Sequence, residues 1–416
     1  MDKTPGELYK ERLKRIEDAV QLKVPDRVPT IIDFGHLGAR YAGITFEEAY
    51  YDIEKWIMAS RKIITEFQPD MFQGLPYASG AVYEAVGTKV MKWPGHGVSP
   101  NHTHQFVEGE YMKADEYDEF MEDPSDFIIR TYLARTCGAL VPFQKLPHLR
   151  DFLGIGQGRA PISIFAETEV AAAFESIYKA AQEATKWDTA WTAFIKDMEK
   201  LGFPAITRMG GQAPFDYISD FLRGMRGTML DMYRQPDKLL EAIERQLSFS
   251  LKRIKSLPEA SGFTLLFAAP HRGADGFMSL KQFEKFYWPG LKAVILALID
   301  KGFTPYMFWE GDYTSRLEYL LELPEGKVLN RFDMTDMFKV KEVLGGHQCI
   351  AGGIVSSLLQ TGTVPDVKDQ CQKLIDVCGK DGGYIMMHSC ELDEAKPENV
   401  KAMIDFTREY GVYKSL

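Results

Sequence analysis

The stretch that decides the fold is Gly382-Gly383-Tyr384-Ile385-Met386-Met387-His388-Ser389-Cys390-Glu391. A short apolar run that ends abruptly at polar residues predicts a buried strand that delivers a thiol to a loop. Alternate residues of a strand share one face, so we expect His388 and Cys390 to point the same way. The strand-end thiol is a candidate metal ligand or nucleophile. The other cysteines are expected to be small buried hydrophobes, namely Cys137, Cys349, Cys371 and Cys378.

Seven more apolar segments have the same character, and most are followed by a stretch with helical periodicity. In chain order, the predicted strands are 28–34, 69–73, 204–209, 263–268, 303–308, 327–332, 348–353 and 383–387. Eight strands separated by helices predict an α/β chain folded as a parallel (β/α)8 TIM barrel.

Helix starts support this order of elements. Ser279 precedes a helical pattern after the fourth strand, Asp312 is expected to cap a helix over 313–321, and Thr335 or Asp333 one over 337–344. The gap after the second strand is too long for one crossover, which predicts an inserted region at about 75–201 with helices around 170–201. Nothing in the pattern requires a domain boundary, so residues 1–416 are expected to form one barrel domain.

Composition restricts the class of protein. The chain has 416 residues, a formal charge of -10 and five scattered cysteines. Interspersed charges of net negative sign argue against a general nucleic-acid surface, and the longest apolar run, 293–299, is too short to span a bilayer. The start lacks a secretory signal, and the cysteine usage suits a reducing compartment. We therefore expect a cytoplasmic protein without nucleic-acid or membrane partners.

At this point the chain resembles the uroporphyrinogen decarboxylase superfamily. The matching residues are Pro-Asp-Arg-Val-Pro at 25–29, Gly-Gln-Ala-Pro-Phe at 211–215, the run Met278 to Pro289, Pro-Glu-Asn-Val at 397–400 and Glu-Tyr-Gly-Val-Tyr at 409–413. Their order extends over nearly the whole chain. The resemblance implies a distorted (β/α)8 barrel with its active site at the carboxyl ends of the strands.

Within that superfamily, the porphyrinogen decarboxylases carry an arginine-rich loop after the first strand. Residues 32–40 of this chain hold a single arginine, Arg40, so this loop offers too few cationic side chains to bind a substrate with many carboxylates. The glycine doublet and Cys390 are instead similar to the corrinoid-dependent methyltransferase branch. That branch implies zinc at the strand ends and a separate protein that carries the corrinoid (cobalamin). No Asp-x-His-x-x-Gly cobalamin loop occurs in this chain.

The metal ligands that the resemblance implies are incomplete here. Thiol-methylating members end the fifth strand with His-x-Cys, whereas this chain has Phe308-Trp309-Glu310. Zinc accepts Cys, His, Asp and Glu, so Glu310 and Cys390 are candidate ligands. The nitrogen ligand is expected from His271, after the fourth strand, or from His388, which is less favoured because it lies deeper.

Other strand-end residues are expected to complete the site. Asp33, His36 and Asp333 are the candidate catalytic acid or base groups. The candidate substrate-binding residues are Phe34, Tyr77, Arg208, Gln212, Phe308 and Trp309. Aromatic members of this set, with Tyr313, are expected to wall a small apolar pocket.

The function expected from the resemblance is zinc-dependent methyl transfer between a small methylated substrate and a separate corrinoid protein. Replacement of a cysteine ligand by Glu310 favours O-demethylation of an aromatic methyl ether. A metal-independent decarboxylase or lyase, a methylcobamide-to-thiol methyltransferase and a noncatalytic corrinoid-binding module remain as alternatives. A homodimer is left open, and the phosphate-binding motifs of nucleotide enzymes are absent from the sequence.

Overall fold

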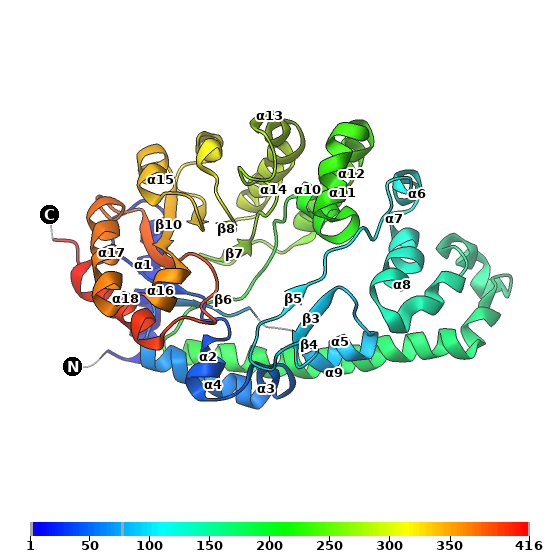
Figure 1. Ribbon diagram of the computed structural model, residues 1–416, viewed down its shortest axis with the longest axis horizontal. Helices are drawn as coiled ribbons and strands as arrows, with labels where there is room; N and C mark the ends of the chain where they lie inside the picture. The colour runs from blue at the N-terminus through cyan, green and yellow to red at the C-terminus, as the bar shows by residue number, and fades with distance from the viewer. Residues whose placement is uncertain (1–2, 76–78, 415–416) are drawn as a thin grey trace.

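All eight expected strands are present in the computed structural model, which describes residues 3–75 and 79–414. Each strand overlaps its predicted range, and the strands surround a central core (Figure 1). They are β1 (Ile31–Ile32), β2 (Met71–Gln73), β6 (Ala205–Ile206), β7 (Leu265–Ala268), β8 (Thr304–Trp309), β9 (Leu329–Phe332), β10 (Cys349–Ile354) and β11 (Tyr384–His388).

The strands pair in the order of a TIM barrel, but in two parallel sheets. One sheet has the order β1-β2-β6 and the other has β11-β10-β9-β8-β7. Single parallel bridges join the sheets, one between Thr30 and Met386 and one between Met209 and Phe267. Each seam is thus one bridge in place of a continuous ladder, and this interruption is what distorts the barrel.

The barrel interior is filled by alternate strand residues. Phe267, Tyr306 and Phe308 belong to this inner cluster, while their sequence neighbours face the outer helices. The cluster also includes Ile16, Ala19 and Val20 of α1 (Pro5–Val20). Helix α1 therefore closes the end of the barrel where the strands begin.

A buried ion network fixes α1 at that end. Asp70, which is 1% exposed, precedes β2 and accepts hydrogen bonds from Arg15 Nη1 at 2.6 Å and from Arg27 Nη2 at 2.7 Å. The backbone N of Thr30 donates to the same carboxylate at 2.9 Å. The side chain of Asp70 thus joins helix α1 to the first two strands.

Helices cover the outside of the barrel. Those after β1 are α2 (Leu37–Ala42), α3 (Phe46–Tyr51) and α4 (Ile53–Phe67), and those after β6 are α10 (Pro214–Tyr217), η5 (Ile218–Arg223), α11 (Gly224–Arg234) and α12 (Pro236–Ser256). The later ones are α13 (Leu280–Gln282), η6 (Phe283–Tyr287), α14 (Trp288–Asp300), η7 (Thr314–Glu322), α15 (Met337–Leu344), α16 (Ser356–Thr361), α17 (Val364–Val377) and α18 (Pro397–Tyr410). No helix in the described ranges is long and apolar enough to cross a membrane.

Two of the expected helix starts need correction. Ser279 caps α13 as predicted, because its side chain accepts from the backbone N of Gln282. The cap of α15 is Asp336, whose carboxylate accepts from the backbone N of Phe338, and neither Thr335 nor Asp333 fills this role. The segment after Asp312 is the 3-10 helix η7, in which the first backbone amide, that of Thr314, is satisfied by Asp312.

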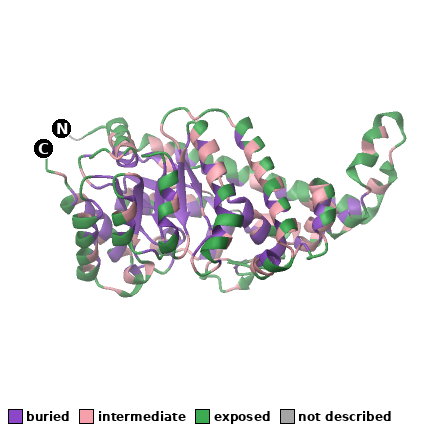
Figure 2. Cartoon of the chain, turned by 90° about the horizontal axis from the view of Figure 1, so that it is seen from above, coloured by how far each residue is buried: buried purple, intermediate pink, exposed green. Residues whose placement is uncertain are grey.

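The long region after β2 is elaborated, as its length predicted. It contains α5 (Gly80–Val86), a small sheet of β3 (Met91–Pro94), β4 (Gly97–Val98) and β5 (Gln105–Phe106), then α6 (Tyr117–Glu122), α7 (Pro124–Asp126), η1 (Phe127–Tyr132), α8 (Leu133–Thr136), η2 (Gly138–Lys145), η3 (Leu149–Gln157), η4 (Ile162–Ala166) and α9 (Thr168–Lys200). Helix α9 has 33 residues and returns the chain to the barrel. Figure 2 shows the exposed arm that projects beyond the barrel on this helix.

Candidate functional site

Two candidate ligands meet at the mouth of the barrel, where the strands end. His271 follows β7 and Glu310 follows β8, and these strands are neighbours in the sheet. The Nε2 atom of His271 lies 3.3 Å from Oε2 of Glu310. The two side chains are 36% and 45% exposed, so the pair faces the solvent-accessible mouth.

A second carboxylate holds the other side of the His271 ring. Nδ1 of His271 lies 3.0 Å from Oδ2 of Asp220 in η5. Burial lowers the pKa of His271, but Asp220, Asp216 and Glu310 outweigh burial and raise that pKa to about 9. The imidazole is therefore a cation at neutral pH, held between two acidic side chains.

Asp216 positions the loop after β7 that carries His271. It is fully buried at the start of α10, and its carboxylate accepts from the backbone N of His271 at 3.0 Å and of Arg272 at 3.1 Å. The hydroxyl of Tyr287 donates to it at 2.7 Å. Burial and the nearby Asp220 raise the pKa of Asp216 to about 6. These contacts make Asp216 a positioning residue for His271.

More carboxyl groups gather around the same mouth. Burial raises the pKa of Glu310, and the charges of Glu391 and Asp333 raise it further against the lowering effect of His271. Burial also raises the pKa of Asp333, whose Oδ2 accepts from the backbone N of Gly311 at 3.2 Å. The mouth thus holds carboxyl groups that retain protons more readily than free ones.

Cys390 lies two residues beyond β11, at the strand end where the sequence predicted it. Its thiol donates to Oε2 of Glu391 at 2.8 Å. Burial and the charge of Glu391 raise the pKa of the Cys390 thiol to about 12. A thiol in this setting is protonated and is a weak nucleophile.

His388 lies one layer deeper and uses both ring nitrogens. Its Nε2 accepts from the backbone N of Asp33 at 3.0 Å, and its Nδ1 contacts the carbonyl of Cys390. Burial, followed by the charge of Arg331, lowers the pKa of His388 well below its usual value. The ring is neutral and ties the end of β11 to the end of β1.

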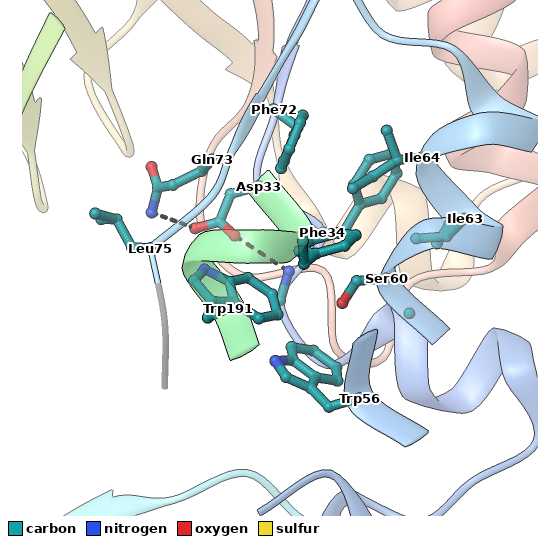
Figure 3. Close-up of a pocket in the computed structure, with 13 residues that line it drawn as sticks. Asp33, Phe34, Trp56, Ser60, Ile63, Ile64, Phe72, Gln73, Leu75 and Trp191 are labelled. Atoms are coloured by element: carbon teal, nitrogen blue, oxygen red, sulfur yellow. Dashed lines mark hydrogen bonds between the residues drawn. The ribbon is translucent and has the colours of Figure 1, made fainter. Parts of the chain in front are cut away.

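A small cavity adjoins Asp33 on the outer side of β1 and β2 (Figure 3). The Asp33 carboxylate accepts from Nε2 of Gln73 at 2.7 Å and from the backbone N of Gly35 at 3.1 Å. Burial raises the pKa of Asp33 to about 6, although Arg331 lowers it. Phe34 is among the residues that line this cavity, and its predicted role in substrate binding stays a prediction.

His36 is buried beside this region and does not reach the His271 pair. Its backbone N donates to Oδ1 of Asp393 at 2.8 Å, and its Nδ1 lies 3.4 Å from Oδ2 of the same carboxylate. Its ring packs on Phe46 and Tyr50 at centroid distances of 4.8 and 5.6 Å. These contacts bind the loop after β1 to the loop after β11.

The remaining substrate-binding candidates are dispersed. Gln212 lies at the mouth, where its Nε2 donates to Asp220 at 3.3 Å, and Phe308 packs inside the barrel. Trp309 faces the outer layer, with its Nε1 donating to Asn330 at 3.0 Å, and exposed Arg208 lies over Phe303 at 5.8 Å. Tyr77 lies outside the described residues.

The predicted zinc ligands do not form a metal site in this arrangement. Within residues 3–75 and 79–414, no group of three His, Cys, Asp or Glu side chains is placed to hold a metal ion. His271 and Glu310 are adjacent, but the Cys390 thiol is bound to Glu391 and the His388 ring to the backbone. The donor types suit zinc, whereas their positions do not.

Several residues of the mouth were missed by sequence reasoning, namely Asp216, Asp220, Arg272, Arg331 and Glu391. Arg331 lies two residues after Leu329, which faces the barrel interior, and residues two apart in a strand share a face. The sequence therefore predicts a charged side chain in the interior. Its guanidinium is buried and donates to the carbonyls of His388 at 3.2 Å and Ser389 at 2.9 Å. Asp220 follows Asp216 by four residues, which is the spacing of side chains that share a helix face.

Comparisons with known proteins agree with the architecture. The sequence profile of the family described as Uroporphyrinogen decarboxylase (URO-D) matches residues 160–410. Among solved structures, a methyltransferase from Methanosarcina mazei has a TM-score of 0.60 and 15% sequence identity, covering 96% of this chain and 98% of that one. At this identity the likeness establishes the fold. A search of curated proteins gives no match.

Proposed function

This chain belongs to the uroporphyrinogen decarboxylase family, and from that premise we propose that it is a methyltransferase acting on a small methylated substrate and a separate corrinoid protein. The observation that carries the proposal is the cationic His271 held between Asp220 and Glu310 at the barrel mouth. The resemblance to the corrinoid-dependent branch and the likeness in fold to a methyltransferase support it. An aromatic methyl ether is the donor expected from the sequence.

The mouth has the groups that methyl transfer from an oxygen or a neutral nitrogen requires. The corrinoid on its partner supplies the nucleophile that takes the methyl carbon. The electron pair of the broken bond stays on the leaving atom, which then needs a proton. Nε2 of His271 faces the mouth beside Glu310 and donates that proton. Asp220 keeps the ring oriented throughout, because it holds Nδ1.

The arginines near the mouth argue against recognition of a polycarboxylate, as in the decarboxylase branch. Arg331 is enclosed in the barrel and donates to main-chain carbonyls, and Arg272 Nε is paired with Asp220 at 3.2 Å. Arg208 lies over Phe303 in the outer layer. Arg331 and Arg272 are therefore already paired, and Arg208 is exposed in the outer layer, away from the mouth, which favours a substrate without several carboxylates.

Zinc remains a proposal that rests on the resemblance. It would require Glu310, His271 and Cys390 to converge, with Cys390 leaving Glu391 and His271 Nε2 losing its proton, so zinc would replace the protonated His271 as the group that acts on the leaving atom. Zinc at this place would polarise the leaving atom. Elemental analysis of protein purified without added metal tests the proposal. About one zinc per chain in the wild type, lost in both Glu310→Ala and Cys390→Ala, supports it, and a metal-free active enzyme contradicts it.

The function itself is tested with free cob(I)alamin and a panel of aryl methyl ethers, methylated amines and methylated thiols, followed by the cobalt absorption spectrum. We expect transfer by the wild type and a loss of about a hundredfold or more for ether donors in His271→Gln. Asp188→Asn, an exposed change on α9, is the matched control. If no donor methylates cobalt, or if His271→Gln transfers at the rate of the control, the proposal is wrong.

A further inference from the structure

The arm carried by α9 presents a concentrated apolar surface to solvent. It extends beyond the barrel and is largely exposed (Figure 2). Eight of the 24 large apolar residues that are exposed in the described ranges lie between residues 141 and 178, namely Val141, Leu149, Leu153, Ile155, Ile162, Phe174, Ile177 and Tyr178. Single exposed apolar residues are normal on a soluble protein, whereas a concentrated set marks an interaction surface.

The core of the arm covers one part of α9 and leaves another uncovered. The buried members of this core are Leu140, Phe143, Leu146, Val170 and Ala173. The ring of Phe174 packs on Phe143 and Phe165 at centroid distances of 4.9 and 5.5 Å, yet this residue stays 41% exposed. Leu153 in η3 and Tyr178 in α9 are 91% and 64% exposed. The arm therefore folds on itself and keeps a second apolar surface open.

The open side of α9 carries a stripe with the spacing of a helix–helix contact. Its members are all exposed and are Ala171, Phe174, Tyr178 and Ala181. Steps of three and four residues keep such side chains on one face of a helix. The stripe follows, one position later, the buried face that contains Val170, Ala173 and Ala180. The apolar side of α9 is thus wider than the arm itself can cover.

The stripe is complementary to itself. Its order is small, large, large, small, and it is symmetric about residue 176. When two copies of the helix lie antiparallel across a two-fold axis at this residue, Phe174 of each copy meets Tyr178 of the other. Ala171 likewise meets Ala181 of the other copy. A two-fold contact needs this kind of surface, because the same patch serves on both sides.

The charges beside the stripe suit the same pairing. Glu175 and Lys179 form an ion pair of 2.8 Å, and their side chains are 62% and 63% exposed. In the antiparallel pair, Lys179 of each copy lies about 3 Å along the helix axis from Glu175 of the other. Each carboxylate then has a lysine of its own helix and one of the second copy within a turn.

The overall charge of the arm also favours a second copy. Residues 141–181 hold four basic and four acidic side chains, although the whole chain has a formal charge of -10. The basic ones are Lys145, Arg150, Arg159 and Lys179, and the acidic ones are Asp151, Glu167, Glu169 and Glu175. Two chains of like net charge repel each other, and a neutral arm allows them to meet with the least repulsion.

We propose that the arm joins two copies of this chain in an antiparallel homodimer, through Ala171, Phe174, Tyr178 and Ala181 of α9. The centre of this contact lies about 36 Å along the helix from its end at Lys200. The barrels therefore take no part in the contact, and each mouth is complete within one chain. The proposal stands on the arm alone and is independent of the proposed methyl transfer.

The association is tested by light scattering and sedimentation equilibrium on the full chain, over a dilution series from about 50 µM, because interfaces of standard size have dissociation constants of micromolar or below. We expect a wild-type dimer. Tyr178→Lys places a charge in the centre of the stripe and should raise the dissociation constant at least tenfold. Tyr233→Lys is the matched control, because Tyr233 is 75% exposed on α11 outside the arm, and it should dimerise as the wild type does.

Two charge reversals test the antiparallel pairing itself. Glu175→Lys leaves four positive charges at the contact and Lys179→Glu leaves four negative ones, so each variant alone should dissociate at least tenfold more readily than the wild type. An equimolar mixture of the two variants brings opposite charges together. The mixture should form a mixed dimer at least as tight as the wild-type dimer.

Three results would overturn the proposal. They are a monomeric wild type at about 50 µM, a dimer that Tyr178→Lys leaves unchanged, and charge-reversal variants that do not associate when mixed. A monomeric wild type in which Tyr178→Lys slows methyl transfer to a corrinoid protein, but not to free cob(I)alamin, would assign the arm to that partner instead.

Discussion

Replacing Asp216 with alanine tests how the mouth is held together. The buried carboxylate accepts hydrogen bonds from the backbone N atoms of His271 and Arg272 and from the hydroxyl of Tyr287. In Asp216→Ala all three donors lose their acceptor, and the His271 loop loses its anchor. The variant should therefore lose both stability and the orientation of His271 towards Glu310.

The size of the stability loss follows from the number of donors. Each unsatisfied buried donor costs about 1–3 kcal/mol, which for three donors gives an upper range near 9 kcal/mol. Removal of the buried charge offsets part of this, since the pKa of Asp216 is raised to about 6 by burial and by Asp220. We expect a net loss of about 2–4 kcal/mol in the free energy of unfolding, within the usual range for buried polar networks.

The assay is urea unfolding in a double-mutant cycle with Tyr287→Phe. Tyr287→Phe alone removes one donor and should cost about 1–2 kcal/mol. In the Asp216→Ala background the same change should cost nothing, because the hydroxyl already lacks its acceptor. Additive effects of the two substitutions would refute the reasoning, as would a loss below about 1 kcal/mol in Asp216→Ala.

Three more predictions concern other parts of the barrel. Burial raises the folded pKa of Asp33 from 3.8 to about 6, so its contribution to stability is present below pH 3.8 and lost as pH rises through 6. As pH rises from 3.8 to about 6, urea unfolding should show the stability of Asp33→Asn increasing relative to that of the wild type by at most about 3 kcal/mol. A stability difference between the two proteins that does not change with pH would contradict this explanation. With the Cys390 pKa at about 12, chelator-treated protein should be alkylated at this thiol by iodoacetamide far more slowly than a free thiol at pH 8, as mass spectrometry can measure. Asp70→Ala leaves Arg15 and Arg27 without their shared acceptor and should cost about 3–5 kcal/mol in unfolding experiments, whereas a loss below about 1 kcal/mol would mean that the network carries little stability.

The strand order was predictable because each strand has a compact apolar run followed by polar residues. Each of the eight predicted ranges overlaps a strand, and the length of the gap after the second strand predicted that this region is elaborated. Its small sheet was not foreseen, because β4 and β5 have only two residues each and leave no period in the sequence. The cap at Asp336 was misplaced by a few residues because Asp333, Thr335 and Asp336 all have capping side chains.

The site was predictable in outline and less so in detail. Strand ends located His271, Glu310 and Cys390 at one mouth, but sequence alone does not determine the rotamers that pair His271 with Glu310 and Cys390 with Glu391. Phe308 and Trp309 illustrate a second limit. Adjacent strand residues face opposite sides, so the two rings cannot share one wall, and the structure places Trp309 in the outer layer.

The plug formed by α1 has a consequence for the order of events during turnover. Because Ile16, Ala19 and Val20 fill the end where the strands begin, under the proposed function the methyl donor and the bulky corrinoid protein use the same entrance. A donor cannot enter once the protein partner covers that entrance. Under the proposed function, initial-rate kinetics should therefore follow a compulsory sequence, with the small donor first and the demethylated product released only after the partner departs.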